Sequence, residues 1–305
     1  MKGRVFKSTG SFYLVVGADD KNYNCRARGK LRLEEYKESN PVAVGDWVEF
    51  EEEGSEGTIS EILQRTNHVL RQSVKRTEHS SVLAANVDQA ILMATVAQPR
   101  TSLGFIDRFL VSCEAYRIPQ VIIFNKSDLL NEEHTVLVQE LLDMYERLGV
   151  RAILMSAVNF DQRENILNML SGKTSLLAGH SGVGKSTLLN QLSPEIEQTV
   201  NPISDFSDKG MHTTTFAEMF RLDKDTFIID TPGVKEWGLV NMNQQEISDY
   251  FPEMRELRND CKFGSKCLHF NEPKCAIVDA VKAGEIALSR YEIYLGMVSG
   301  KDNRK

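Results

Sequence analysis

The sequence predicts a multi-domain fold in which a small all-β barrel comes first, an α/β domain follows, and a mainly helical domain comes last. Residues 1–68 contain short runs of β-branched and aromatic residues separated by turn residues, with no long helical period. From about residue 85, apolar runs of strand length alternate with helical patterns, which indicates a mostly parallel sheet covered on both faces. Beyond about residue 238 the pattern is helical and polar.

We expect domains at residues 1–68, 69–237 and 238–305, because 305 residues allow two or three domains. The first has the length and strand spacing of an oligonucleotide/oligosaccharide-binding (OB) barrel, although other small barrels fit nearly as well. Its Trp47 is expected in the core rather than on a stacking surface.

The central domain is predicted from five apolar runs with helical patterns between most of them. The expected strands are 89–97, 120–125, 150–155, 174–178 and 226–230, and the expected helices include 106–116, 132–148 and 185–192. Such an arrangement places loops at the carboxyl ends of parallel strands, where open α/β sheets bind ligands.

The composition is that of a globular protein. Hydrophobic residues make up 41% of the chain and charged residues 26%, which argues against a disordered chain. No apolar run approaches the ~20 residues that span a bilayer, and the N-terminal apolar stretch is too short for a signal peptide. We therefore expect a cytoplasmic protein without membrane contact, and nothing in the sequence suggests more than a monomer.

The net charge of −7 hides segments of opposite charge. Residues 2–32 carry eight basic side chains against two acidic ones, whereas residues 34–61 carry ten acidic side chains against one lysine. Charge asymmetry of this kind fits a polyanion-binding face and a solvated surface about equally. A second basic cluster consists of Arg65, Arg71, Lys75 and Arg76.

A glycine-rich motif of the form G-x-x-x-x-G-K-S follows the apolar run 174–178 and precedes an amphipathic helical pattern, which argues against an accidental match. Its backbone N–H groups are expected to surround phosphates. Lys185 is expected to reach the β- and γ-phosphate oxygens, and the Ser186 hydroxyl to ligate Mg²⁺. The residues predicted to contact the nucleotide here are Gly179, His180, Ser181, Gly182, Val183, Gly184, Lys185, Ser186 and Thr187.

The segment Asn125-Lys126-Ser127-Asp128, after the apolar run 120–124, predicts which base is bound. The Asp128 carboxylate can accept hydrogen bonds from guanine N1–H and the exocyclic amine, a donor pair that adenine lacks. Lys126 is expected along the base plane, and Asn125 is expected to tie this loop to the phosphate loop. By itself the segment could be a polar turn; beside a phosphate loop it favours GTP over ATP.

Two further segments are typical of the switch regions that sense a γ-phosphate. In Asp230-Thr231-Pro232-Gly233, Asp230 is expected to hold Mg²⁺ through water and the Gly233 N–H to bond the γ-phosphate. Upstream, three adjacent threonines at 213–215 offer a Mg²⁺ ligand, of which we select Thr214. The alternatives are an acidic turn at 230–233 and a β-branched lead into a strand at 213–215.

The motifs occur in a circularly permuted order. The base loop (125–128) comes first, Ser156-Ala157 is placed next to offer guanine O6 a backbone N–H, and the phosphate loop and the two switch segments follow. In ordinary GTPases the switch segments precede the base loop. The same sheet closes in either order if the original termini lie close together. The central domain is therefore predicted to be a circularly permuted α/β P-loop GTPase domain.

Val234 stands where many GTPases carry the glutamine that orients the attacking water. Valine cannot hydrogen-bond that water, so we expect slow intrinsic turnover that depends on a partner or on another side chain. His212, in the segment 210–215, is the nearest candidate for that side chain; the alternative is that His212 only packs in its loop. Lys185 is the other residue predicted to take part in catalysis.

Four metal-ligating side chains lie within fifteen residues in the pattern Cys-x5-Cys-x-His-x5-Cys. Three thiolates and one imidazole match a structural zinc site with all four positions filled. The predicted ligands of one Zn²⁺ are Cys261, Cys267, His269 and Cys275. Cys25 and Cys113 stand apart and are expected to be buried thiols.

These motifs make the chain resemble a known family, the bacterial ribosome small-subunit-dependent GTPase A, a group of circularly permuted ribosome-biogenesis GTPases. The resemblance covers nearly the whole chain and rests on the permuted order, the segments 210–215 and 230–234, and the cysteine cluster. It implies an OB-type RNA-binding barrel, a permuted GTPase domain and a C-terminal zinc-binding domain. It also implies GTP hydrolysis to GDP during late maturation of the small ribosomal subunit, binding to its rRNA, and turnover stimulated by that particle.

Two other functions remain open at this point. In the first, GTP only sets an RNA-binding conformation and turnover is incidental, a possibility that Val234 permits. In the second, the chain is a P-loop ATPase or kinase, which Asn125-Lys126-Ser127-Asp128 disfavours. Stimulation of turnover by small subunits and competition by ATP discriminate among the three.

Overall fold

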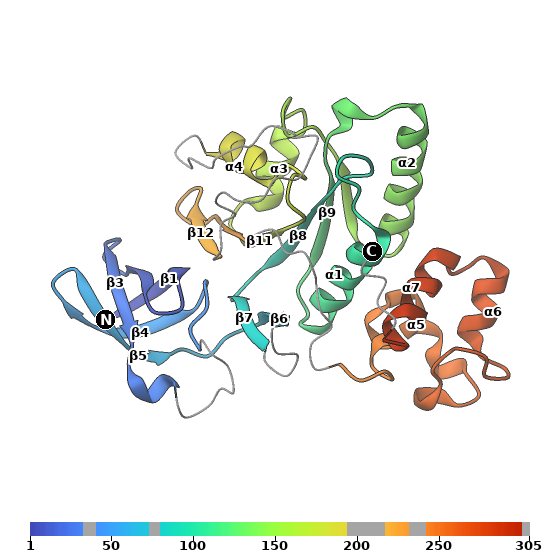
Figure 1. Cartoon of the computed structure of the whole chain (residues 1–305), viewed down its shortest axis with the longest axis horizontal. Helices are drawn as coiled ribbons and strands as arrows, with labels where there is room; N and C mark the ends of the chain where they lie inside the picture. The colour runs from blue at the N-terminus through green and yellow to red at the C-terminus, as the bar shows by residue number, and fades with distance from the viewer. Residues whose placement is uncertain (33–40, 73–79, 194–216, 232–241, 301–305) are drawn as a thin grey trace, which may run out of the picture.

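The computed structural model describes residues 1–32, 41–72, 80–193, 217–231 and 242–300. Figure 1 shows a β barrel, a central α/β domain and a helical C-terminal domain side by side, with the central domain in the middle. The predicted fold class is confirmed for all three parts. Among the described residues, no helix combines the length and apolar character needed to cross a bilayer.

Five short strands form the barrel: β1 (Lys2–Ser8), β2 (Tyr13–Gly17), β3 (Asn22–Ala27), β4 (Trp47–Glu53) and β5 (Glu56–Ile62). Their order is β1-β2-β3-β5-β4, and β1 also pairs with β4, which closes the barrel. Only the β3–β5 pairing is parallel among these pairs. This closed Greek-key order is that of an OB-type barrel, so it selects this barrel among the small barrels that the sequence left open. Alternate side chains of the strands fill its interior, among them Val5, Val15, Tyr23, Phe50 and Ile59.

Trp47 corrects one prediction, because its side chain is 44% exposed and lies outside the barrel core. Trp47 opens β4, where the burial pattern alternates and Val48 rather than Trp47 faces inward. The guanidinium of Arg4 lies 5.3 Å from the centre of the Trp47 ring. Tryptophan is usually buried because it is large and apolar. In β4, however, successive side chains point to opposite faces of the sheet, so with Val48 inside the barrel Trp47 points outward.

A hairpin of β6 (His68–Gln72) and β7 (Ser80–Ala85) lies between the barrel and the central sheet. Arg65, just before it, donates two hydrogen bonds of 2.7 Å to the fully buried carboxylate of Asp46 in the barrel. Arg4 of β1 donates to the Thr174 hydroxyl at 2.9 Å, and Lys7 of β1 pairs with Glu218 at 2.9 Å. These polar contacts fix the barrel against the central domain.

The central sheet has five parallel strands in the order β10 (Arg151–Leu154), β9 (Gln120–Phe124), β8 (Gln89–Ala94), β11 (Thr174–Ala178) and β13 (Phe227–Asp230). The short strand β12 (Glu218–Arg221) adds antiparallel to β13 and also touches β1 of the barrel. Every residue of β8 and β11 is buried, as expected of central strands with both faces covered.

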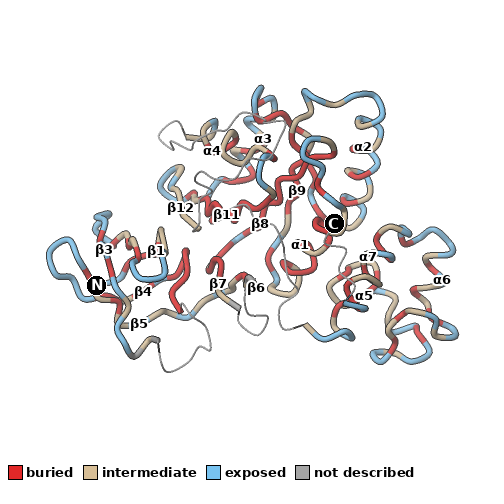
Figure 2. The backbone as a smooth tube through the Cα atoms, viewed as in Figure 1, coloured by how far each residue is buried: buried red, intermediate tan, exposed pale blue. Residues whose placement is uncertain are grey.

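Helices cover both faces of this sheet, as predicted (Figure 1). On one face, α1 (Leu103–Ala115) and α2 (Glu132–Arg147) pack on side chains such as Leu92 and Ile122. On the other, α3 (Arg163–Leu170) and α4 (Lys185–Leu192) pack on Ile91 and Met93. Figure 2 shows the buried residues concentrated along the strands, whereas much of α2 faces solvent.

The C-terminal domain is mainly helical, with η3 (Ile247–Tyr250), α5 (Pro252–Leu257), η4 (Arg258–Asp260), η5 (Gly264–Lys266), α6 (Ala276–Ala283) and α7 (Leu288–Val298). Its core contains the three cluster cysteines together with Phe251, Met254, Ile277 and Tyr294. Val111 of α1 belongs to the same buried cluster, so the domain packs against the central domain through that helix.

Candidate functional site

The predicted nucleotide-site loops all follow parallel strands of one sheet. Asn125 follows β9, Ser156 follows β10 by one residue, Gly179 follows β11, and Asp230 ends β13. Because parallel strands end at the same edge, the fold gathers four motifs that are up to 105 residues apart in the sequence. The site therefore lies at the carboxyl edge of the sheet.

Asn125 joins three of these loops. Its amide nitrogen donates to the Val183 carbonyl of the phosphate loop at 2.7 Å, and its amide oxygen accepts from the Ala157 N–H at 2.8 Å. The side chain is 4% exposed. The tie to the phosphate loop matches the expectation for Asn125; the bond to Ala157 is a contact that the sequence reasoning missed, since no local pattern links residues 125 and 157.

The phosphate loop needs glycine at its close approaches. A Cβ on Gly184 would lie 2.3 Å from the Asn125 amide nitrogen, and Gly184 has a φ of +106°. A Cβ on Gly179 would lie 2.4 Å from the Met93 carbonyl oxygen. Helix α4 then begins at Lys185, so its unpaired N–H groups face the loop. The backbone is thus shaped to surround an anion.

Lys185, which is half-buried, and Asp230, which is buried, are two charged groups beside that loop. The Lys185 Nζ donates to the carbonyls of Gly179 at 2.8 Å and His180 at 3.2 Å. Burial lowers the pKa of Lys185, and the charge of Asp230 opposes the shift. Burial raises the pKa of Asp230 to about 6, against the opposing effect of Lys185.

One carboxylate oxygen of Asp230 is buried and has no hydrogen-bond partner among the described residues. A buried acceptor without a partner is costly unless a ligand satisfies it. The donor set of a carboxylate and the Ser186 hydroxyl near phosphate oxygens suits Mg²⁺, which prefers oxygen ligands and retains waters. The residues present therefore fit this ion.

The base loop is held in place by contacts of its backbone and of Lys126. Lys126 has a φ of +68°, and its Nζ donates to the Gln98 carbonyl at 2.5 Å. The Ser127 N–H donates to the Met155 carbonyl at 3.1 Å, which holds this loop against the one after β10. Asp128 is exposed at the start of the short helix η2 (Ser127–Leu129), where its carboxylate is accessible.

Ser156 and Ala157 are both buried in the loop after β10. The Ser156 N–H donates to the Asp161 carboxylate at 3.1 Å, and the Ser156 hydroxyl accepts from the Asn159 N–H at 3.3 Å. The loop is therefore held by its own side chains as well as by Asn125.

Several predicted site residues lie outside the described residues. They are His212, Thr214, Gly233 and Val234. Thr231, which is described, is fully buried and donates its hydroxyl hydrogen to the Leu177 carbonyl at 2.9 Å. This bond fixes the start of the second switch segment on β11.

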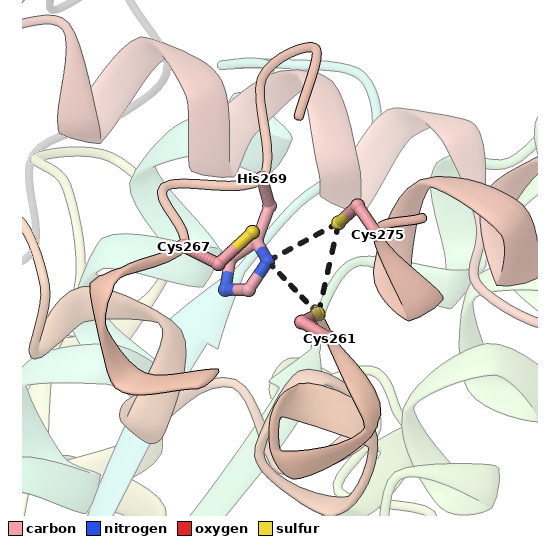
Figure 3. A group of neighbouring side chains, drawn as sticks. All are labelled: Cys261, Cys267, His269 and Cys275. Carbon is pink, nitrogen blue, oxygen red and sulfur yellow. Dashed lines mark hydrogen bonds between the residues drawn. The ribbon is translucent and has the colours of Figure 1, made fainter. Parts of the chain in front are cut away.

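The cysteine cluster forms a closed, buried group in the C-terminal domain (Figure 3). The four ligand atoms of Cys261, Cys267, His269 and Cys275 lie within 4.8 Å of one another, and all four residues are buried. The Cys261 and Cys275 sulfurs are 3.8 Å apart, and the His269 Nδ1 lies 3.6 Å and 3.4 Å from them. A tetrahedral zinc ion with Zn–S of ~2.3 Å and Zn–N of ~2.0 Å has S···S and S···N edges of about 3.8 and 3.5 Å.

The chemistry of the cluster also fits a cation. Burial raises the pKa of the Cys275 thiol to about 12 and raises the pKa of Cys267, so the thiolates need a positive ion beside them. Burial lowers the pKa of His269, which keeps the imidazole neutral as a ligand must be. The cluster could therefore hold one zinc ion.

Three side chains that sequence reasoning missed hold the loop around this cluster. Glu272 accepts from the N–H groups of Leu268 at 2.8 Å and Phe270 at 2.7 Å. Tyr291 and Tyr294 of α7 donate to the carbonyls of His269 and Leu268 at 2.6 and 3.0 Å. No sequence pattern could have indicated the two tyrosines, because they lie 22 and 26 residues from the carbonyls that they bond. The prediction that Cys25 and Cys113 are buried is confirmed.

Comparison with known proteins places the chain in a family. The family model described as RsgA GTPase matches residues 62–240, and the RsgA N-terminal domain matches residues 2–59. The chain belongs to the RsgA GTPase family. It is 46% identical over 307 residues to the small ribosomal subunit biogenesis GTPase RsgA of Christiangramia forsetii, which covers 99% of this chain and 97% of that protein.

Other RsgA relatives are equally similar. The Cytophaga hutchinsonii protein of the same name is 47% identical over 311 residues and covers both chains completely. Among solved structures, YjeQ from Thermotoga maritima matches with a TM-score of 0.76 and 34% identity over 100% of this chain and 99% of that one. YloQ, described as a circularly permuted GTPase, matches with a TM-score of 0.73 and 31% identity, covering 100% and 96%. The predicted permuted order is thus confirmed.

Proposed function

We propose that this RsgA-family chain binds the small ribosomal subunit and hydrolyses GTP to GDP and phosphate during late maturation of that subunit, with turnover stimulated by the particle. The observation that carries the proposal is the joining of base loop and phosphate loop by Asn125 at one edge of the sheet. The names of the RsgA relatives support the small subunit as the partner.

The nucleotide roles follow the predicted motifs. Asp128 would select guanine, Lys126 would lie along the base, and the Ala157 N–H would bond guanine O6. The N–H groups of residues 181–187 would bind the phosphates. Bound Mg²⁺ would be held by Ser186, Thr214 and, through water, Asp230, and it would stabilise negative charge on the phosphate oxygens.

For hydrolysis, water attacks the γ-phosphorus in line with the leaving oxygen of GDP. The chain's contribution is electrostatic: the Lys185 ammonium and the loop N–H groups stabilise the charge that develops on the phosphate oxygens. In the structure, Lys185 is bonded to the Gly179 and His180 carbonyls, so the ammonium would exchange these acceptors for phosphate. The Gly233 N–H would bond the γ-phosphate.

Slow turnover in the free protein is part of the proposal. Val234 cannot orient the attacking water, and His212 would take that role when the chain is bound to the small subunit. A sensor of this kind hydrolyses GTP rapidly only in the assembled complex, which couples turnover to the state of the particle.

The barrel is proposed as the RNA-binding part. Its surface carries exposed Phe12 and Trp47, and the Arg26 guanidinium lies 4.6 Å from the centre of the Phe12 ring. Aromatic rings beside cations suit the bases and phosphates of unpaired RNA. This surface supports the reading of the basic segment 2–32 as a polyanion-binding face.

We further propose one structural Zn²⁺ bound by Cys261, Cys267, His269 and Cys275, units at residues 1–68, 69–237 and 238–305, and a monomeric cytoplasmic protein. The spacing of the Cys261, His269 and Cys275 ligand atoms matches the edges of a zinc tetrahedron, and the Cys267 sulfur lies within 4.8 Å of them, which supports the zinc ion. Sedimentation analysis tests the monomer, and limited proteolysis followed by mass determination tests the boundaries.

The decisive experiment measures GTP turnover with and without purified small ribosomal subunits. We expect slow turnover alone and a rise of at least tenfold with subunits; nucleotide-dependent binding without stimulation would instead support a GTP-regulated binding protein. The Asp128→Asn variant is the control for the base. This variant should lose affinity for GTP and gain affinity for XTP. Xanthine carries a carbonyl where guanine carries the amine, and the asparagine amide can donate a hydrogen bond to that carbonyl. Competition of GTP by ATP at equal potency would overturn guanine selectivity.

A further inference from the structure

Helix α1 reaches from the nucleotide loops to the C-terminal domain. Its first turn carries Phe105, which is 2% exposed. The centres of the Phe105 and His180 rings are 3.9 Å apart, and the ring planes meet at 32°. His180 is the second residue of the phosphate loop. Rings at this separation are in van der Waals contact. A shift of α1 therefore moves the Phe105 side chain that packs against His180 of the phosphate loop.

The loop that enters α1 touches the site a second time. The Gln98 carbonyl accepts from Lys126 of the base loop at 2.5 Å. Pro99 atoms lie 3.6 and 3.7 Å from the position that a Cβ on Gly182 would occupy. The loop before α1 is thus bonded to the base loop and lies beside the phosphate loop.

Asp107, two residues after Phe105, faces the C-terminal domain. Two residues correspond to about 200° around a helix, so the two side chains point to opposite sides. The fully buried Asp107 carboxylate accepts from Arg290 of α7 at 2.6 Å and from the Tyr145 hydroxyl at 3.1 Å. Burial raises the pKa of Asp107, and the charge of Arg290 opposes that shift.

Arg290 is itself anchored within the C-terminal domain. It donates to both carboxylate oxygens of Glu253 at 2.8 and 3.1 Å, and its guanidinium lies 4.7 Å from the centre of the Phe251 ring. Further along α1, Glu114 accepts from Arg255 of α5 at 2.6 Å. A buried charge that loses its partner is left uncompensated, so α1 and the C-terminal domain move as one body or incur a large penalty.

We propose that His180 is a positioning residue that ties the phosphate loop through Phe105 to α1, so that the seating of the C-terminal domain on α1 sets the affinity for guanine nucleotide. The inference rests on the proposed function of this site. Because coupling between two sites is reciprocal, nucleotide binding must also tighten the seating of the domain by the same factor. The contact of that domain with a partner would thereby be transmitted to the nucleotide.

The test is the affinity of the full-length protein for the fluorescent analogue mant-GDP in the presence of Mg²⁺. Arg290→Met should weaken binding about tenfold, which lies within the usual range of coupling between sites. Phe105→Leu and His180→Ala should each weaken it. In the Phe105→Leu background, Arg290→Met should change the affinity less than about threefold, because the connection is already broken. The matched control is Lys282→Met, which removes a cation from an exposed pair of the same domain and should leave affinity unchanged.

An equal effect of Arg290→Met in both backgrounds, or no effect in either, overturns the inference. If Arg290→Met does not fold, Arg290→Lys keeps a charge beside Asp107 but loses the paired bond to Glu253, and it should weaken binding about threefold. Wild-type affinity in that variant likewise overturns the inference.

A second measurement needs no variant. Amide exchange in α7 of the unaltered protein should slow when mant-GDP is bound, and unchanged exchange would contradict the coupling. Absence of any guanine-nucleotide binding by the unaltered protein would sink the proposed function together with the inference, whereas binding without coupling would sink the inference alone.

Discussion

The nucleotide site and the cysteine cluster are both built from loops, but they differ in whether their polar groups already have partners within the protein. The four ligand atoms of the cluster lie within 4.8 Å of one another and all four residues are buried, so the ligand set is complete without any further molecule. The nucleotide site instead keeps a buried Asp230 oxygen without a partner among the described residues, and it holds Lys185 on carbonyls of its own loop. A closed site suits a permanent structural ion, and an unfinished one suits a ligand that binds and leaves.

The largest expected effect breaks the closed site. Cys267→Ser should abolish binding of one zinc ion and unfold the C-terminal domain, because structural zinc contributes roughly 10–16 kcal/mol to small domains. Zinc content by mass spectrometry and the far-UV circular dichroism spectrum check this. Cys113→Ala, in a buried cysteine outside the cluster, should retain the zinc. A zinc content unchanged by Cys267→Ser would remove Cys267 from the ligand set.

The next largest effect concerns Asp230 in the nucleotide site and the stability of the ligand-free protein. Asp230 has a folded pKa of about 6, raised by burial from 3.8, so its charged form opposes folding above that pH. The resulting destabilisation is absent below about pH 4, grows between about pH 4 and 6 and is complete above about pH 6, where it amounts to about 3 kcal/mol. Asp230→Asn should therefore stabilise the ligand-free protein at pH 8 while abolishing Mg²⁺-dependent turnover.

Urea unfolding without Mg²⁺ at pH 8 and at pH 4 measures that difference. The free energies of unfolding of the variant and the wild type should differ at pH 8 and become similar at pH 4. Equal stability at both values would show that the Asp230 charge is already compensated in the free protein.

A smaller effect tests the join between the two nucleotide loops. Gly184→Ala places a Cβ 2.3 Å from the Asn125 amide nitrogen at a φ of +106°, so it should weaken GDP binding by about a hundredfold through strain and loss of the joining hydrogen bond. Gly172→Ala is the control, because a Cβ there meets no atom within 4 Å although its φ is also positive. Isothermal titration of GDP into the two variants makes the comparison, and similar affinities would contradict the role of Asn125.

The smallest effect belongs to a surface pair outside both sites. Lys282 and Asp279 lie 3.3 Å apart, with 72% and 65% of their side chains exposed. Lys282→Met should change the free energy of unfolding by less than about 0.5 kcal/mol, because water screens exposed pairs. A larger change in urea unfolding would mean that this helix contributes to a contact beyond the pair.

Much of each site was predictable because its chemistry is local in sequence. The predicted phosphate loop is one run of eight residues, and the predicted zinc ligands lie within fifteen, so spacing along the chain was enough to propose both. The contacts that support them were not predictable, because Tyr294 lies 26 residues from the Leu268 carbonyl that it bonds and Asn125 lies 58 residues from Val183.

By itself, the sequence determined the type of each domain, the base preference expected of Asp128, and the permuted motif order, since these depend on residue identity and spacing along the chain. Only the tertiary structure decided that the barrel closes through a β1–β4 pairing, that Trp47 faces outward, and that α1 links His180 to Arg290. These features depend on which distant segments pack together. Packing is set by the burial of whole surfaces rather than by any one local pattern.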